Sequence, residues 1–363
     1  MIEEGQDLYT TRNMLPLIEE IKLPSKFLKE RYFGRMRTFE SKIVEFDLLL
    51  GRRQKAVPIH FKQGDILVGR LGFKTYSLEA PYFCPSTLTT AEDVINYRQA
   101  GEHCYSTRSL RERLSEIAGR DLRRLESLLI AAEEDLCAQI LFYGKLPASY
   151  TKMDKDINLW EDLADAAQPV TKLKGDSLWS GTKANPLKDL RAVRRTVIQR
   201  SGISPREAIM GTEAIEAFLA YLEKSGQVLD NRRLDLGFIT PENLPEGVTY
   251  WGNLRDSGLD IYSYDATVTN ADETEITPVI PAKAVLVGSQ SVMTTMCYGA
   301  CPVLEGNGVD FSIAALPRVP SSYVSTKSPV GKVLRLATRP LPIVHEVQGF
   351  HVLWPLGYKE QAV

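Results

Sequence analysis

Cys297 and Cys301 are the residues whose type and spacing come nearest to a chemical centre in this chain. They close the stretch KAVLVGSQSVMTTMCYGACPV at residues 283–303, after an apolar strand and a Ser-Gln-Ser step. Thiolates at such a spacing bind zinc, but a closed zinc site needs four ligands. No second cysteine or histidine pair at ligand spacing follows. We interpret the two as small buried side chains near a turn, since free cysteine packs like a small hydrophobic residue, and we expect neither a metal nor another cofactor.

Other residue types that could support catalysis are scattered. Ser289 and Ser291 have no histidine close in sequence, and the chain holds no G-x-S-x-G motif. Phosphate-binding motifs of the types G-x-x-x-x-G-K-S/T and G-x-G-x-x-G are missing as well. His345 and His351 flank Gly349 in a predicted strand, where surface positions or satisfied hydrogen bonds are expected. The remaining cysteines and histidines stand alone: Cys84, Cys104, Cys137, His60 and His103. We therefore expect no catalytic residue and no enzymatic activity.

The composition is that of a globular protein. Of 363 residues, 44% are hydrophobic and 25% are charged, and the formal net charge is −2. A dedicated nucleic-acid-binding protein carries a basic surplus, which this chain lacks. No run approaches the ~20 apolar residues of a membrane span, and the acidic N-terminus predicts no secretory signal. Five scattered cysteines do not suggest a disulfide framework, so we expect a reducing cytoplasm.

The clearest predicted element is a helix over residues 119–144. Apolar residues recur in it at three- and four-residue spacing, and Gly144 is a natural end. Its charged residues fall mostly on the other side, where we interpret the run Glu133, Glu134 and Asp135 as a solvated face. The helix would be ~35–40 Å long, the scale of a whole domain. Its apolar stripe comprises Leu122, Leu125, Leu129, Ala132, Leu136, Ile140 and Tyr143.

Residues 38–81 predict a long, exposed hairpin that has little to pack against in its own chain. Apolar strand residues are interrupted there by Gly64, Gly69 and Gly72. Basic residues are interleaved with these glycines: Arg52, Arg53, Lys55, Lys62, Arg70 and Lys74.

Beyond the hairpin and the long helix, helices and strands are mixed. A second helix begins with Asn185 as its N-cap and Pro186 at its first position, and it ends at Gly202. A short strand and a third helix after Thr212 follow, and the rest of the chain is rich in strands. This order of elements favours an α+β fold over a βαβ alternation.

The stretch ALPRVPSSYVSTKSP at residues 315–329 resembles the tail of the lambda-type major capsid protein family, capsid protein E. The matching positions are Arg318, Pro320, Tyr323, Val324, Thr326 and Pro329. Thr338 and Arg339 stand where the family more often has Gln-Ser, and Ser328 stands where an aspartate is common. Looser likenesses occur in the same order at residues 27–33, 80–82, 179–186 and 283–299. The resemblance therefore covers nearly the whole chain.

This resemblance implies the tailed-phage major capsid fold. Residues 1–30 are expected to form an N-terminal arm and residues 31–90 an extended hairpin loop with its flanks. The parts that follow are a peripheral domain at 91–185, whose spine helix is 119–144, and an axial domain at 186–318. Residues 319–363 would return as strands to the peripheral domain. Cys297 and Cys301 would lie where the axial domain turns back toward the peripheral one.

The implied function is that of a tailed-phage major capsid protein, which builds hexamers and pentamers of an icosahedral shell around double-stranded DNA. A separate scaffolding protein, a portal and a decoration protein are the implied partners, with non-specific contact to packaged DNA and no membrane. The virion capsid would be assembled in the host cytoplasm. An encapsulin-type shell and a soluble enzyme remain alternatives. Subunit contacts are expected at five basic hairpin residues: Arg52, Arg53, Lys62, Arg70 and Lys74.

Overall fold

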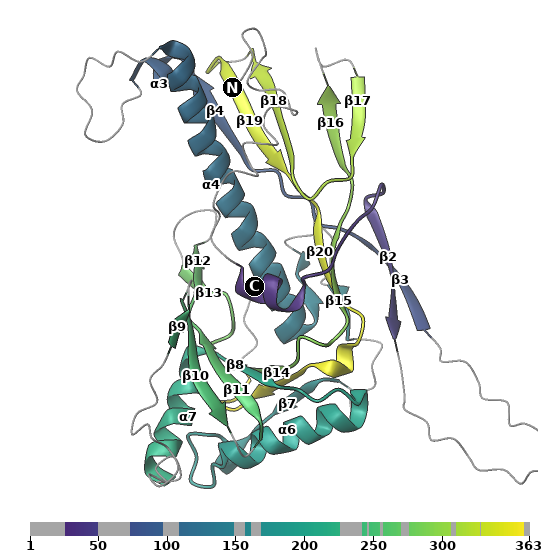
Figure 1. The fold of residues 1–363 in the computed structure, drawn as a ribbon, viewed down its shortest axis with the longest axis vertical. Coiled ribbons are helices and arrows are strands. Elements are labelled where there is room, and N and C mark those ends of the chain that lie inside the picture. Colours follow the sequence, from purple (N-terminus) through teal and green to yellow (C-terminus); the bar gives the residue numbers. More distant parts are fainter. Residues whose placement is uncertain are drawn as a thin grey trace, which may run out of the picture.

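The computed structural model describes residues 26–49, 73–96, 109–148, 157–160, 168–225, 242–244, 247–254, 257–269, 276–305, 310–326 and 328–358. The protein is elongated, and one long helix, α4, runs from the upper end of the molecule to its base (Figure 1). A mixed sheet with α6 and α7 forms the base, and the hairpin β2–β3 leaves the body at one side. The α+β prediction is confirmed. None of the described helices is long and apolar enough to cross a membrane.

The long helix is α4 (Leu110–Ala138), continued by one π-helical turn, η1 (Gln139–Tyr143). It ends, as predicted, at Gly144, whose φ of 64° suits glycine. Its beginning differs from the predicted residue 119, because Ser109 and Glu112 form a reciprocal capping box at its start. The Ser109 Oγ accepts from the Glu112 amide at 3.3 Å, and the Glu112 carboxylate accepts from the Ser109 amide at 2.9 Å.

The apolar stripe of α4 packs on a three-stranded sheet in the order β18-β19-β4. Leu122, Leu125 and Leu129 form a buried cluster with Leu334 and Leu336 of β19. The prediction that this stripe faces a core is therefore confirmed. The strands are β4 (Ser86–Thr90), β18 (Val319–Ser325) and β19 (Gly331–Ala337).

The base of the molecule is a seven-stranded mixed sheet in the order β7-β21-β14-β8-β11-β10-β9. Only the pairs β21–β7 and β11–β8 are parallel. Because β7 and β21 join this sheet, it draws on residues at both sides of the range 186–318. Its strands are β7 (Val170–Lys172), β8 (Glu207–Met210), β9 (Glu242–Leu244), β10 (Val248–Leu254), β11 (Leu259–Tyr264), β14 (Val285–Gly288) and β21 (His351–Trp354).

Two helices cover one face of this sheet, and the foot of α4 covers the other. The predicted caps of α6 (Pro186–Ser201) are present: Asn185 accepts from the Lys188 amide at 3.0 Å, and Gly202 has a φ of 71°. α7 (Thr212–Ser225) lies in the same layer. Successive strand residues alternate between layers, since Met210 packs with α6 and α7 whereas Ile209 belongs to the core around the end of α4.

A small sheet joins these two halves. Its order is β1-β15-β20, and β1 runs parallel to β15. The strands are β1 (Met36–Thr38), β15 (Thr294–Tyr298) and β20 (Pro340–Val344). The remaining elements are α3 (Ala91–Asn96), β5 (Lys145–Leu146), β6 (Ile157–Asn158), β12 (Thr267–Thr269), β13 (Ile276–Pro278), β16 (Cys301–Glu305), β17 (Asp310–Ala314) and the short helices η3 (Gly175–Ser177) and η5 (Val347–Gly349).

The predicted hairpin is present as the antiparallel pair β2 (Ile43–Leu49) and β3 (Phe73–Glu79). Residues 50–72, with the three glycines and all but one of the five proposed contact residues, lie outside the described part. The expectation that the hairpin has little to contact in its own chain is wrong for its base. Val44 is fully buried in the main core, and Phe46 stacks on Tyr76 at 5.8 Å between ring centres.

Candidate functional site: the charge networks around residues 27–32

A short helix leads directly into the first strands before the hairpin. α2 (Phe27–Tyr32) buries Leu28 and Tyr32, and the next residue, Phe33, is also buried. The ring of Phe27 lies 5.2 Å from that of Tyr264 in β11. α2 therefore sits between the foot of α4 and the seven-stranded sheet (Figure 1). Its position fixes where the chain enters β1 and the hairpin.

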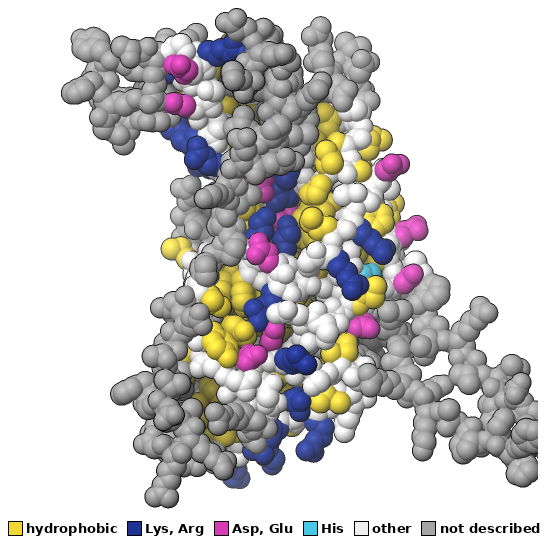
Figure 2. All heavy atoms as spheres, viewed as in Figure 1, with side chains coloured by type: hydrophobic (Ala, Val, Ile, Leu, Met, Phe, Trp, Pro, Cys, Tyr) yellow, Lys and Arg dark blue, Asp and Glu magenta, His cyan; other side chains and the backbone are white. Residues whose placement is uncertain are grey.

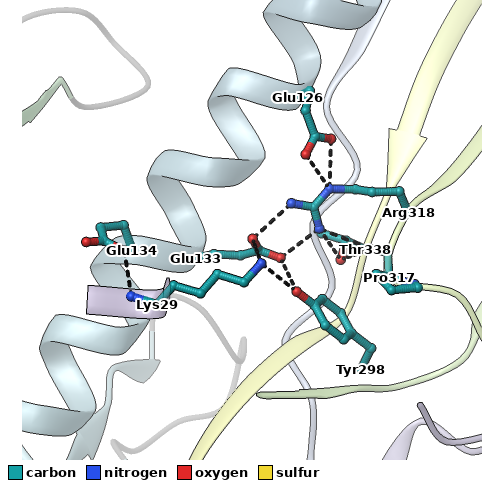
Figure 3. A network of polar contacts seen from close by, with 8 residues as sticks. All are labelled: Lys29, Glu126, Glu133, Glu134, Tyr298, Pro317, Arg318 and Thr338. Atoms are coloured by element: carbon teal, nitrogen blue, oxygen red, sulfur yellow. Dashed lines mark hydrogen bonds and ion pairs between the residues drawn. The ribbon is translucent and has the colours of Figure 1, made fainter. Parts of the chain in front are cut away.

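The carboxylate of Glu133 on α4 is the centre of a buried polar network (Figure 3). The Arg318 guanidinium donates to both of its oxygens, at 2.6 and 2.9 Å. Lys29 of α2 lies 2.9 Å from Oε2, and the Tyr298 hydroxyl donates to Oε1 at 3.0 Å. Lys29 also donates to the Tyr298 hydroxyl at 2.8 Å. One carboxylate thus joins α4 to α2, to β15 and to the segment before β18.

Arg318 reaches a second carboxylate on the same helix. Its Nε lies 2.9 and 2.7 Å from the two oxygens of Glu126, which is 2% exposed. Its Nη1 also donates to the Pro317 carbonyl at 3.0 Å and to Thr338 Oγ1 at 3.3 Å. The planar fork of arginine suits this arrangement, since its fixed donors can serve two carboxylates at once. The formal charges of the network sum to zero, because the carboxylates of Glu126 and Glu133 are matched by the cations of Arg318 and Lys29.

The electrostatics of the network favour the ionised forms. Burial by itself raises the pKa of Glu133, but the hydrogen bonds and charge of Arg318, with Lys29, lower it to about 2. Burial lowers the pKa of Lys29, but the charges and hydrogen bonds of Glu133 and Tyr298 together more than offset this, so the net shift is upward. Burial and the Glu133 charge raise the pKa of Tyr298 to about 12. The network is therefore a set of fixed charges at neutral pH.

Glu134, the next residue on α4, caps the start of α2. Its carboxylate accepts from the amides of Leu28 at 2.7 Å and Lys29 at 3.2 Å, and from the Tyr264 hydroxyl at 3.1 Å. The first amides of a helix have no partner within the helix, so a carboxylate there satisfies them. Glu134 thereby ties α2 to both α4 and β11.

A second network holds the other end of α2. Arg31 donates to both oxygens of Glu207 in β8, at 2.8 and 3.0 Å, and lies 4.3 Å from the ring centre of Tyr262. The Tyr32 hydroxyl and the Gln290 amide donate to the same carboxylate, at 3.0 and 2.8 Å. α2 is therefore fixed by charge-assisted hydrogen bonds to the helix above it and to the sheet below it.

The sequence-based interpretation of Glu133, Glu134 and Asp135 as a solvated face is wrong. Glu133 has no exposed surface, Glu134 is 5% exposed, and Asp135 is partly buried. A third side of α4 is covered by α2 and β15, whose residues lie more than a hundred positions away in the chain. A local signal existed, since Glu126 and Glu133 are seven residues apart and share one helix face. Their partner Arg318 had been singled out only as a motif position.

The two cysteines of the opening motif lie in consecutive strands that belong to different sheets. Cys297 is buried in β15 opposite Arg37 and Leu341, and Cys301 begins β16 in a cluster with Val303. Burial raises the pKa of both thiols to about 11. Within the described residues, no three potential ligands among histidine, cysteine, aspartate and glutamate are close enough to hold a metal ion. Cys104 lies outside those residues.

Both histidines near the C-terminus have hydrogen-bond partners, which is one of the two arrangements expected. The His351 Nε2 lies 2.8 Å from Thr171 Oγ1, and the His345 Nε2 lies 3.0 Å from Thr295 Oγ1. His345 Nδ1 is also 3.0 Å from the carbonyl oxygen of Asp47 in β2. This last contact helps to join the hairpin base to the body. His60 and His103 lie outside the described residues.

The sequence matches the family model described as phage major capsid protein E over residues 10–350. The chain belongs to the phage major capsid protein E family. It is a phage major capsid protein, and the resemblance seen at residues 315–329 is confirmed. No curated protein sequence is significantly similar to it.

Solved structures show the fold of this major capsid protein. A protein described as a prophage capsid protein from Escherichia coli CFT073 is 16% identical, with a TM-score of 0.64, over 95% of this chain and 98% of that one. A phage-related protein from Bordetella bronchiseptica RB50 is 13% identical, with a TM-score of 0.52, over 94% and 95%. A chain of the cyanophage A-1(L) capsid is 12% identical, with a TM-score of 0.51, over 98% and 97%. At such identities the likeness establishes the tailed-phage major capsid fold.

Proposed function

We propose that this major capsid protein assembles as hexamers and pentamers into the icosahedral head of a tailed phage that encloses double-stranded DNA. The observation that carries the proposal is the hairpin β2–β3. Within the described residues it pairs with no further strand, and it leaves the body while its base stays anchored (Figure 1). A strand pair of this kind is typical of a segment that completes its packing on a neighbouring molecule.

Side-chain burial along β2 supports this reading. Val44 and Phe46 are buried in the molecule's own core, whereas Ile43, Glu45 and Asp47 are exposed. One face of the hairpin base is therefore already used within the chain, and the other is available to a neighbour. Each hairpin contact would contribute a modest free energy of association, but a closed lattice contains many copies of it.

The proposed subunit contacts include the basic residues of the hairpin. Arg52, Arg53, Lys62, Arg70 and Lys74 would meet acidic groups of the neighbouring subunit. Lys74 lies in β3 opposite Leu48, so it belongs to the outer part of the paired region. Charged residues at the edge of an interface affect the register and the rate of subunit association more than its affinity.

The proposal includes the assignment of residue ranges to domains that the family resemblance implies. Residues 1–30 serve as the arm, 31–90 as the extended loop with its flanks, 91–185 as the peripheral domain, to which strands of 319–363 return, and 186–318 as the axial domain, whose sheet also includes β7 and β21. Shell assembly in the host cytoplasm uses a separate scaffolding protein and a portal, a decoration protein is a further partner, and packaged DNA is contacted without sequence preference. The protein acts as a building block and not as an enzyme.

Electron microscopy of the expressed protein tests the proposal. The chain is produced alone and together with the scaffolding gene of its own phage, and each product is separated by sedimentation. Closed shells with capsomers of five and six subunits are expected. A product that stays monomeric or dimeric in both cases would rule the proposal out. Shells isolated from phage-producing cells that contain a cargo protein in place of DNA would support the encapsulin alternative.

A further inference from the structure

Two stripes of opposite charge lie on the solvent side of the helix layer that covers the seven-stranded sheet. On α6, Lys188, Arg191 and Arg195 are exposed, and all three are turned away from the buried residues of that helix. In Figure 2, dark-blue side chains gather along the lower edge of the molecule, where Figure 1 places α6. On α7, Glu216 and Glu223 are exposed. We name these sets the basic stripe and the acidic stripe.

The two stripes have the same repeat. Lys188 and Arg195 are seven residues apart, and so are Glu216 and Glu223. At 1.5 Å per residue, each pair spans about 10.5 Å along its helix. Ala220, also exposed, lies between the two glutamates, so the acidic stripe has no bulky side chain at its middle. Two helices with these stripes can lie side by side with both charge pairs matched.

Within the described residues of one molecule, Lys188 and Arg195 form no ion pair with Glu216 or Glu223. In the ion pairs of the described residues, Glu213 at the start of α7 is bound by Lys283 at 3.4 Å and not by α6. Figure 1 places α7 at the left end of the layer and α6 to its right.

We propose that the basic stripe of α6 in one subunit binds the acidic stripe of α7 in the next subunit of the same capsomer. The inference rests on the proposed function, because it requires several copies arranged around a common axis. A contact between two different patches of one chain is head-to-tail, and its repetition closes a ring when the rotation between neighbours is fixed. A polyanion such as DNA is a poorer occupant of the basic stripe, because the acidic stripe of the same layer would repel it.

A charge-swap experiment tests the contact. The variant K188E/R195E and the variant E216K/E223K each replace attraction by repulsion at every contact, and we expect each to lower the yield of capsomers by more than about tenfold. The combined variant, with all four reversals, restores opposite charges and should recover most of the yield. Capsomers are measured by sedimentation, and the fold of each variant by circular dichroism. High salt should also lower the yield of wild-type capsomers, because it screens the attraction between the two stripes.

The control R123E/R124E makes the same charge change at exposed positions of α4, away from both stripes, and its yield should stay near that of the wild type. Normal capsomers from K188E/R195E would overturn the inference and leave the proposed function intact. Failure of the combined variant to recover would also overturn it, as would a loss of DNA retention in filled heads with capsomer yield unchanged. A wild-type protein that forms no capsomers would instead contradict the proposed function itself.

Discussion

The guanidinium of Arg318 and the carboxylate of Glu133 face each other in a two-bond ion pair, with N–O distances of 2.6 and 2.9 Å. The arginine side chain is 10% exposed and the glutamate side chain is fully buried. Charges this deep are tolerated only when their hydrogen bonds are satisfied, and removal of one partner leaves the other without compensation. The pair therefore couples the C-terminal part of α4 to the residue that directly precedes β18.

Replacing Arg318 by methionine should destabilise the fold strongly. Glu126 and Glu133 would remain buried with only Lys29 as a positive partner, at a cost of about 3–5 kcal/mol in the free energy of unfolding. Denaturant unfolding of the soluble subunit measures the change. Arg124→Met, on the exposed side of α4, should stay within about 0.5 kcal/mol of the wild type. Equal stability of the two variants would mean that the network does not hold the fold.

Glu134→Ala should release the start of α2 while α4 stays formed. The amides of Leu28 and Lys29 lose their acceptor, which costs about 1–2 kcal/mol. Hydrogen exchange of these two amides should accelerate by about tenfold, and Glu134→Gln, which keeps one acceptor oxygen, should show a smaller effect. Unchanged exchange in the alanine variant would show that the carboxylate is dispensable for α2.

Stability should fall on mild acidification because of His351. Burial, aided by the charge of Arg200, lowers the pKa of His351 to about 4 from an unfolded value of about 6.5. Between those pH values the unfolded chain takes up a proton that the folded chain excludes, so the stability present above pH 6.5 is lost progressively. The full effect is on the order of 3 kcal/mol. Melting temperatures across this range should decline less in His351→Gln than in the wild type.

A second acid transition should follow at lower pH. Glu133 has its pKa lowered to about 2 by Arg318 and Lys29, against burial, so its contribution is complete above the unfolded value of about 4.5. It is lost as the pH falls from there toward 2. A pH profile of His351→Gln isolates this second window, and an unfolding curve that is flat between pH 4.5 and 2 would contradict it.

Reversal of hairpin charge should separate folding from assembly. Arg70→Glu combined with Lys74→Glu should leave the circular dichroism and melting of the subunit unchanged, because the hairpin is anchored through Val44 and Phe46 at its base. The same variant should give few shells in electron microscopy with scaffold co-expressed, since repulsion replaces attraction at every lattice contact. Arg123→Glu with Arg124→Glu is the matched control on α4. Normal shells from the hairpin variant would show that these charges are not assembly contacts.

Local sequence patterns were sufficient to predict where several helices begin or end. Asn185 and Gly202 bound α6 because an N-cap and a left-handed end depend only on neighbouring residues. Gly144 ends the spine helix for the same reason. The early start of α4 also has local signals, since Leu110, Leu114 and Ile117 continue the apolar repeat upstream and Ser109 with Glu112 forms a readable capping box.

The burial of Glu133 could not be predicted in this way. A carboxylate on a helix is exposed by default, and what buries this one is contributed by residues 104 and 185 positions away. The apolar periodicity of a helix predicts which face is buried in the core. It does not predict which other elements of the chain pack on the remaining faces. The family resemblance identified Arg318 as a motif position but did not predict its ion pairs with Glu126 and Glu133.

The long sequence separations of the Glu133 network set an order of events during synthesis. Glu133 leaves the ribosome 185 residues before Arg318, which corresponds to a delay on the order of 10–40 s. During that interval Lys29 also lacks Tyr298, which is 269 residues beyond it. The helix that precedes the hairpin therefore cannot be locked until most of the polypeptide has been translated. A chain that ends before Tyr298 and Arg318 therefore lacks the contacts that hold α2 in place ahead of the hairpin.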